Sequence, residues 1–184
     1  MADNDNIKNE DSEKEDSLNE NNAGTKQETK PTPTFDIRKI YLKDTSLESP
    51  NAPGIFLTSN NPPDVSIDAS IKAAKLDQDD YYDVSLGITV TSKIEDKTAF
   101  LVEVHQAGVF QISGIPEADI PLALEIACPN VLLPFAREAI ADLVAKAGFP
   151  QLLISPINFE GLHLQKKEAQ KAQLEKEQET IQTH

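Results

Sequence analysis

The feature that most constrains the fold is a pair of alternating patterns in the middle of the chain. Apolar side chains alternate with polar or small ones over residues 82–91, and Phe100, Val102 and Val104 resume the period of two. A period of two places successive side chains on opposite faces of a strand, so each run predicts a strand with one buried face. The polar stretch 93–97 predicts a turn between them, and hence an antiparallel hairpin. Gly108 predicts a β-bulge that changes the apolar register beyond it.

Two further segments precede this hairpin and complete a sheet of four strands. Residues 65–73 alternate in the same way. Residues 35–44 are rich in β-forming residues but carry apolar side chains in both registers. That pattern indicates a strand with protein on both sides, and a second subunit is one candidate for the second layer.

Helical patterns follow the strands. Residues 117–128 have helical spacing, and Pro129 is expected to end that segment. Asn130 is a suitable N-cap for a long helix over residues 131–147, which Gly148 ends. A third helix begins near residue 160 and is expected to fray beyond Lys171. Strands followed by helices predict an α+β fold: a four-stranded antiparallel sheet followed by a long helix and a C-terminal helix.

Composition limits the compartment and the partners. The chain has 31 acidic and 17 basic residues and a net charge of −14, which disfavours nucleic-acid binding and favours basic partners. Its one cysteine, Cys128, permits no intramolecular disulfide and is expected to be a small buried residue of a protein from a reducing compartment. Residues 1–34 hold no apolar signal region, and no run approaches the roughly 20 apolar residues of a membrane helix. We expect a cytoplasmic protein that does not insert into the membrane.

Three segments differ in composition. Residues 1–34 contain nine acidic residues and few large aliphatic ones, so we expect a disordered acidic N-terminal extension. Residues 35–165 carry the strand and helix patterns and are expected to form the folded domain. Residues 166–184 are predicted to be a charged tail, partly helical or disordered.

Motifs of catalysis are missing, whereas apolar loops are in surplus. The sequence has no CxxC, HExxH or GxSxG motif and no phosphate-binding glycine loop, so an enzyme is the weaker hypothesis. The loop around residues 55–57 and the segment 149–159 are rich in both proline and large apolar residues. If they pack side by side, they form a groove for an extended, unfolded chain. Alternatively, residues 55–57 fold back onto the core. Two interpretations are also open for Leu101, which shares a strand face with Glu103: it is either an ordinary exposed leucine or part of a docking surface.

Four segments together resemble the SecB family of protein-export chaperones. They are SPNAPGIF (49–56), AFLVEVHQAGVFQI (99–112), ACPNVLLPFARE (127–138) and FPQLLISPINFEGL (149–162). The resemblance covers about residues 35–164 in uninterrupted order. It implies the same α+β subunit assembled as a homotetramer, a dimer of dimers in which first strands pair between subunits and long helices lie between two sheets.

The resemblance also implies a function. Members of the family hold precursor proteins unfolded in the cytoplasm without nucleotide or metal and deliver them to the SecA motor, whose C-terminal tail is basic and binds zinc. The residues it implies for client binding are Ile55, Phe56, Phe149, Leu152 and Phe159; for SecA docking, Asp44, Glu48, Leu101 and Glu103; and for assembly, Val102, Val104 and Gln106. This chain departs from the family in lacking a tryptophan near Asn60–Asn61 and a cysteine at Val102.

Two alternatives stay open. A SecB-like chaperone could serve a client other than an exported protein, such as an antitoxin, and would then need no docking surface for SecA. A small α+β enzyme would instead show a saturable substrate and turnover.

Overall fold

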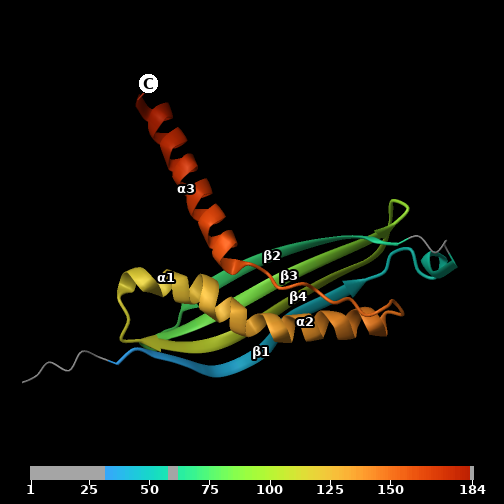
Figure 1. Ribbon diagram of the computed structural model, residues 1–184, viewed down its shortest axis with the longest axis horizontal. Helices are drawn as coiled ribbons and strands as arrows, with labels where there is room; N and C mark the ends of the chain where they lie inside the picture. Colours follow the sequence, from blue (N-terminus) through green and yellow to red (C-terminus); the bar gives the residue numbers. More distant parts are fainter. Residues whose placement is uncertain (1–31, 58–61, 183–184) are drawn as a thin grey trace, which may run out of the picture.

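The computed structural model describes residues 32–57 and 62–182. The predictions for residues 1–31 and for Asn60–Asn61 lie outside this part of the chain. Among the described residues the strands are β1 (Thr34–Glu48), β2 (Asp64–Lys75), β3 (Tyr81–Ile94) and β4 (Lys97–Ser113). They form one antiparallel sheet in the order β1-β4-β3-β2, so β1 and β2 are its edges (Figure 1). Helices follow the strands, which confirms the predicted α+β fold.

The predicted central hairpin is the pair of β3 and β4. These strands are joined by Glu95 and Asp96, whose φ angles are 49° and 64°. A two-residue turn with both φ angles positive matches the right-handed twist of the strands it connects. On β3, the predicted apolar face is fully buried: Val84, Leu86, Ile88 and Val90 are each 0% exposed. The alternation therefore identified both the strand and its buried face.

The predicted bulge at Gly108 is wrong. Gly108 pairs in regular register with Val84 on β3 and with Ile40 on β1, and the inward-facing residues of β4 keep one register throughout. A Cβ atom at Gly108 would lie 2.8 Å from the ring of Phe110 and 3.1 Å from the backbone oxygen of Lys39. The glycine therefore makes room for a close packing contact and does not interrupt the strand.

The irregular pattern of β1 has a different cause from the one predicted. The register of β1 against β4 shifts between Ile37 and Lys39, and again between Leu42 and Asp44. Each shift adds one residue to β1, so the odd- and even-numbered residues exchange sides of the sheet beyond it. As a result Phe35, which pairs with the buried Ile112, and Leu42, which pairs with the buried Gln106, face the same side.

The long helical stretch is continuous, so the predicted break at Pro129 is wrong. It consists of η2 (Glu117–Asp119), α1 (Ile120–Leu122), η3 (Ala123–Ala127) and α2 (Cys128–Lys146). The segment η3 is a wide π-helical turn that ends two residues before Pro129. Proline lacks an N–H and its ring crowds the carbonyl four residues earlier, and a π turn relieves that crowding. Asn130 is not an N-cap; its side-chain amide donates to the backbone oxygen of Ile126 at 2.9 Å.

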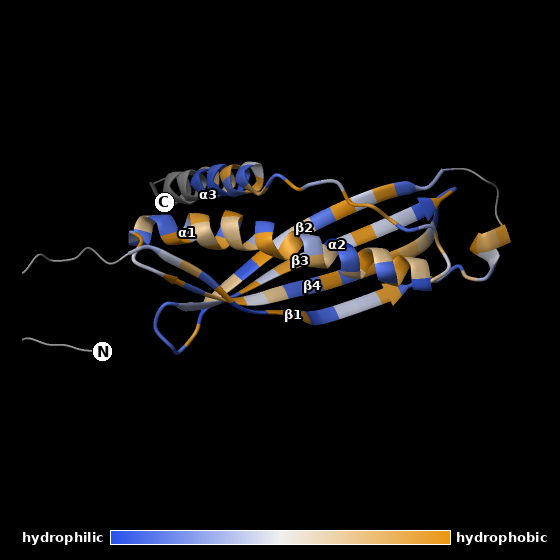
Figure 2. Ribbon diagram, turned by 60° about the horizontal axis from the view of Figure 1, so that its bottom comes forward, coloured by the Kyte–Doolittle hydropathy of each residue, from blue (hydrophilic) through white to orange (hydrophobic). Residues whose placement is uncertain are grey.

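The core lies between α2 and one face of the sheet, which we call the inner face. Leu132, Ala136, Ile140 and Val144 of α2 are 0% exposed and pack over β3 and β4 (Figures 1 and 2). We call the opposite side the outer face. No helix among the described residues lies on the outer face in either view.

A connector and a last helix complete the described chain. Gly148, with φ of +89°, ends the helical stretch as predicted. The connector leads to α3 (Phe159–Gln182), which projects away from the sheet in Figure 1. The helix continues past Lys171, where fraying was expected; its Lys, Glu, Gln and Ala residues are all strong helix formers.

The helical stretch Glu117–Lys146 contradicts the expectation that no segment approaches the length and hydropathy of a membrane helix. Residues Glu117–Lys146 are long and apolar enough, by length and composition, to cross a bilayer. Only 22% of the 18 most apolar consecutive residues of this stretch are buried within the subunit, although the inner side of the stretch packs on the sheet. The stretch therefore presents an apolar surface on its uncovered side.

Candidate functional site

The two apolar loops lie side by side at one end of the sheet. The short helix η1 (Gly54–Leu57) contacts the connector that follows α2. The ring of Phe149 on that connector lies 5.0 Å from the ring of Phe56 and 5.0 Å from the ring of Phe100 on β4, measured between centroids. Such tilted pairs contribute about 0.5–1.5 kcal/mol each beyond the area they bury. Three segments far apart in sequence thus share one aromatic cluster.

This cluster borders a cavity of about 560 Å³, which we call the apolar cavity. Besides Ser92 and Gln151, its lining is apolar or glycine: Ile55, Phe56, Pro62, Pro63, Val65, Ile94, Ala99, Phe100, Gly148, Phe149, Pro150 and Leu152. A concave, mostly apolar site of this size is typical of a ligand or peptide pocket.

Four of the five predicted client-binding residues line the apolar cavity. They are Ile55, Phe56, Phe149 and Leu152. The fifth, Phe159, is the first residue of α3 and is 1% exposed in the hydrophobic core, outside the cavity lining. Its role in client binding stays a prediction.

The three adjacent apolar residues of η1 face different surroundings. Ile55 is 4% exposed and belongs to the core, Phe56 is 49% exposed at the cavity, and Leu57 is 89% exposed. Both alternatives for this loop are therefore correct in part: Ile55 folds back onto the core, and Phe56 borders the apolar cavity.

Sequence reasoning missed the residues that the strands bring to the cavity. Val65 begins the alternation of β2, Ile94 ends β3, and Phe100 begins the alternation of β4. Their periodicity marks them as buried but carries no sign that a loop will leave space beside them. Only the meeting of strand ends and loops creates the cavity.

The four residues predicted for docking share the outer face of the sheet. Glu48 lies directly opposite Leu101, and Asp44 lies opposite His105, two residues along β4 from Glu103. Residues directly opposite one another in an antiparallel pair point to the same side. We call Asp44, Glu48, Leu101 and Glu103 the acidic face. Three carboxylates and one partly exposed leucine on one surface can attract a basic partner.

The residues predicted to affect assembly lie inside the subunit. Val102 and Val104 are 0% exposed and Gln106 is 5% exposed, all on the inner face. The side-chain amide of Gln106 donates to the backbone oxygen of Tyr41 at 2.9 Å, which ties β4 to the edge strand β1. An effect of these residues on assembly would have to act through the packing of β1 and α2.

Large apolar side chains are exposed along β1 and the adjacent side of α2. Phe35 is 40%, Ile37 49%, Leu42 47% and Phe135 43% exposed. We call these four residues the apolar strip. Large exposed apolar side chains along an edge strand are suited to contact with another protein chain.

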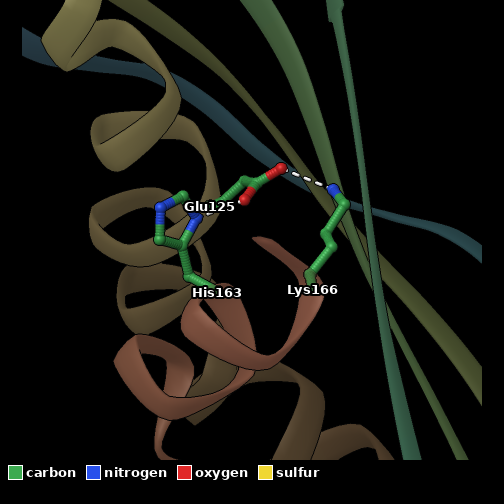
Figure 3. A network of polar contacts seen from close by, with 3 residues as sticks. All are labelled: Glu125, His163 and Lys166. Carbon is green, nitrogen blue, oxygen red and sulfur yellow. Dashed lines mark hydrogen bonds and ion pairs between the residues drawn. The ribbon is translucent and has the colours of Figure 1, made fainter. Parts of the chain in front are cut away.

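A polar cluster attaches α3 to the helical stretch (Figure 3). Glu125 of η3 accepts from Nδ1 of His163 at 2.5 Å and from Nζ of Lys166 at 2.5 Å. Burial acts to raise the pKa of Glu125, but the hydrogen bonds from Lys166 and His163 outweigh it and lower that pKa. His163 is 6% exposed, and its Nε2 atom has no hydrogen-bond partner among the described residues.

The described residues hold no group of three His, Cys, Asp or Glu side chains that could bind a metal ion. Cys128 is buried as predicted, and burial raises the pKa of its thiol to about 12. A thiol of this kind is protonated at neutral pH and unreactive as a nucleophile.

Comparison with known proteins identifies the family. Residues 27–170 match the family model described as preprotein translocase subunit SecB. The chain is 51% identical over 138 residues to the protein-export protein SecB of Methylobacillus flagellatus, covering 75% of this chain and 87% of that one. It is 48% identical over 141 residues to the protein-export protein SecB of Neisseria gonorrhoeae, covering 76% and 95%.

The fold is also that of a solved SecB-like chaperone. The structure of such a chaperone from Mycobacterium tuberculosis, in complex with an antitoxin peptide, superimposes with a TM-score of 0.53. It is 16% identical and covers 67% of this chain and 91% of that one. The chain therefore belongs to the SecB family of protein-export chaperones, a family of chaperones and not of enzymes.

Proposed function

We propose that the protein is an ATP-independent chaperone that holds precursor proteins unfolded and delivers them to the SecA motor for export. The observation that carries the holding function is the apolar cavity, where an aromatic cluster borders about 560 Å³ of space. Extended apolar segments are exposed in unfolded chains and hidden in folded ones. A cavity that recognises apolar surface therefore selects for the unfolded state without sequence-specific hydrogen bonds.

Light scattering coupled to size-exclusion chromatography tests this proposal. The protein is mixed with an unfolded precursor in the absence of nucleotide, and with the same precursor after folding. We expect a stable complex with the unfolded form alone. A chain that ignores unfolded polypeptides under these conditions would contradict the chaperone function.

For delivery, we propose that the acidic face binds the basic, zinc-containing C-terminal tail of SecA. The support is the register of β1 and β4, which gathers Asp44, Glu48 and Glu103 on one surface. None of these residues lines the apolar cavity, so client and motor can be bound together. Charge complementarity of this kind mainly accelerates and orients association.

The alternative client class is an antitoxin or another protein that is not exported. The solved chaperone from Mycobacterium tuberculosis carries an antitoxin peptide, but its 16% identity extends only to the fold. The acidic face favours export, because a chaperone without SecA has no need for such a surface. Binding of purified SecA to the unliganded protein separates the two functions.

We further propose a homotetramer, arranged as a dimer of dimers. The apolar strip and the most apolar part of Glu117–Lys146, of which only 22% is buried within the subunit, both leave apolar surface that further subunits can cover. Pairing of β1 edges would cover the first, and packing of helices between two sheets would cover the second. The expected mass is close to four times the 20.2 kDa of one chain.

We assign the apolar helical stretch Glu117–Lys146 to the core, where α2 packs on the sheet, and to the proposed assembly, and not to a membrane. We propose that this protein acts in the cytoplasm, with residues 35–165 as the chaperone domain and no nucleotide or metal of its own.

A further inference from the structure

His105 adjoins the acidic face and was not among the predicted docking residues. On the outer face it lies directly opposite Asp44 on β1 and opposite Gly87 on β3. Its Nε2 atom is 2.8 Å from Oε1 of Glu103, and its side chain is 23% exposed. A solvent-accessible imidazole is thus bonded to one carboxylate of the acidic face and placed beside another.

The position of the ring depends on the absence of a side chain at Gly87. A Cβ atom there would lie 3.0 Å from both Cε1 and Nδ1 of His105, closer than such atoms normally approach. The imidazole therefore occupies space over β3 that only glycine leaves open. This packing restricts the ring to a site from which Nε2 reaches Glu103.

The other charges near the ring belong to a hollow of about 250 Å³ on the outer face. Besides Glu103 on its own strand, the charged residues that line this hollow with His105 are Lys43 and Asp44 of β1 and Asp83 of β3, which flank β4, and Lys72 of β2, one strand further away. Lys43 and Asp83 form an ion pair at 2.8 Å and compensate each other. That pair leaves Asp44, Lys72 and Glu103 as the other charged groups around the ring, so protonation of His105 adds one positive charge to a set of few.

We propose that His105 belongs to the acidic face and sets part of its charge, so that its protonation weakens the docking of a basic partner. When neutral, the imidazole donates from Nε2 to Glu103 and leaves the carboxylate charge available. When protonated, it forms an ion pair with Glu103 and cancels that charge. The inference rests on the proposed docking function, which it extends by a dependence on pH.

The expected size of the effect follows from Coulomb's law. Histidine is the side chain that ordinarily changes charge between about pH 5 and 8, whereas Asp, Glu, Lys and Arg keep theirs. One unit charge added about 6 Å from a partner charge in a water-like dielectric changes affinity by about threefold. Salt reduces the effect, since all of these groups are near the surface.

The experiment measures binding of a fluorescent peptide, rich in Lys and Arg and free of histidine, to the full chain at pH 6 and pH 8. The charge of this peptide is constant over the range. The variant His105→Gln keeps a neutral hydrogen-bonding side chain, and His105→Lys keeps a permanent positive charge. Glu103→Lys reports whether the peptide binds at the acidic face.

We expect the wild-type Kd to be about threefold higher at pH 6 than at pH 8. His105→Gln should bind at both pH values like the wild type at pH 8, and His105→Lys like the wild type at pH 6. Persistence of the full pH dependence in His105→Gln overturns the inference alone. So does wild-type binding that is sensitive to Glu103→Lys but constant with pH. No binding at either pH overturns both the inference and the docking proposal.

Discussion

Reversing one charge of the acidic face is the most direct test of how the protein would dock on SecA. Glu103→Lys replaces a negative by a positive charge at a side chain that is 43% exposed. It also places a lysine next to His105, which now binds the native carboxylate at 2.8 Å. We expect SecA binding to weaken while unfolded-client binding is retained, because Glu103 does not line the apolar cavity.

The magnitude follows from the exposure of the site. A partner charge about 6 Å away in water contributes roughly 0.7 kcal/mol per unit charge. The substitution changes the charge by two units, so the loss is about 1.4 kcal/mol, or about tenfold in Kd. Most of it should be a slower association rate and should shrink in high salt.

A matched control is available at the opposite end of the sheet. Asp79 is 98% exposed in the turn before β3, and Asp79→Lys makes the same change in net charge. Glu103 lies opposite Thr89, and the strand from there back to Tyr81 is about 27 Å long at 3.4 Å per residue. That separation exceeds the Debye length of about 8 Å at physiological salt. Asp79→Lys should therefore leave SecA binding nearly unchanged.

Binding of SecA and of an unfolded precursor is measured for both variants by surface-immobilised kinetics at two salt concentrations. Equal weakening by Glu103→Lys and Asp79→Lys would show that net charge alone matters, and would refute a localised acidic face. Parallel loss of SecA and client binding in Glu103→Lys would refute the separation of the two surfaces.

Three further changes test the cavity, the core and the attachment of α3. Phe149→Ala removes a ring contact with Phe56 and should weaken unfolded-client binding by about 1 kcal/mol in a competition assay. A client affinity equal to that of the wild type would show that clients do not bind at this cavity. Val104→Ala should lower the free energy of unfolding by about 2 kcal/mol in urea, because a fully buried side chain leaves a void; a loss below 0.5 kcal/mol, on the order of a surface change, would contradict its burial. The folded-state pKa of Glu125 is lowered, so its stabilising contribution is complete above the unfolded value of about 4.5 and is lost as the pH falls through the folded pKa. In Glu125→Gln, the free energy of unfolding should therefore fall less steeply with pH below about 4.5, as measured by circular dichroism. An unchanged dependence on pH would mean that the pair with His163 adds nothing to stability.

Local patterns were sufficient wherever one residue's environment depends on its neighbours in sequence. The alternation in β3 predicted its buried face, because side chains of a strand must point to opposite sides. The polar stretch between β3 and β4 predicted their turn for the same local reason. The resemblance to SecB rested on residues 49–56, 99–112, 127–138 and 149–162, and the family match confirmed it.

Local patterns failed where packing overrode them. Pro129 predicted a helix break, but the π turn of η3 absorbs the proline and the helix continues. Gly108 predicted a bulge, yet it makes room for the ring of Phe110 in a regular strand. In each case the residue has two structural uses, and the surrounding packing decides between them.

By itself the sequence determined the order of strands and helices, the buried face of the hairpin and the family. Only the tertiary structure decided the two surfaces. The acidic face exists because the register of β1 against β4 places Asp44 and Glu48 beside Leu101 and Glu103. The apolar cavity exists because η1 and the connector after α2, about 90 residues apart in sequence, meet over the strand ends. Phe159, which the sequence also suggested for client binding, lies in the core instead. Hydrophobicity is a property of each residue, whereas a surface or a cavity depends on distances between residues that are remote in sequence, and folding alone establishes those distances.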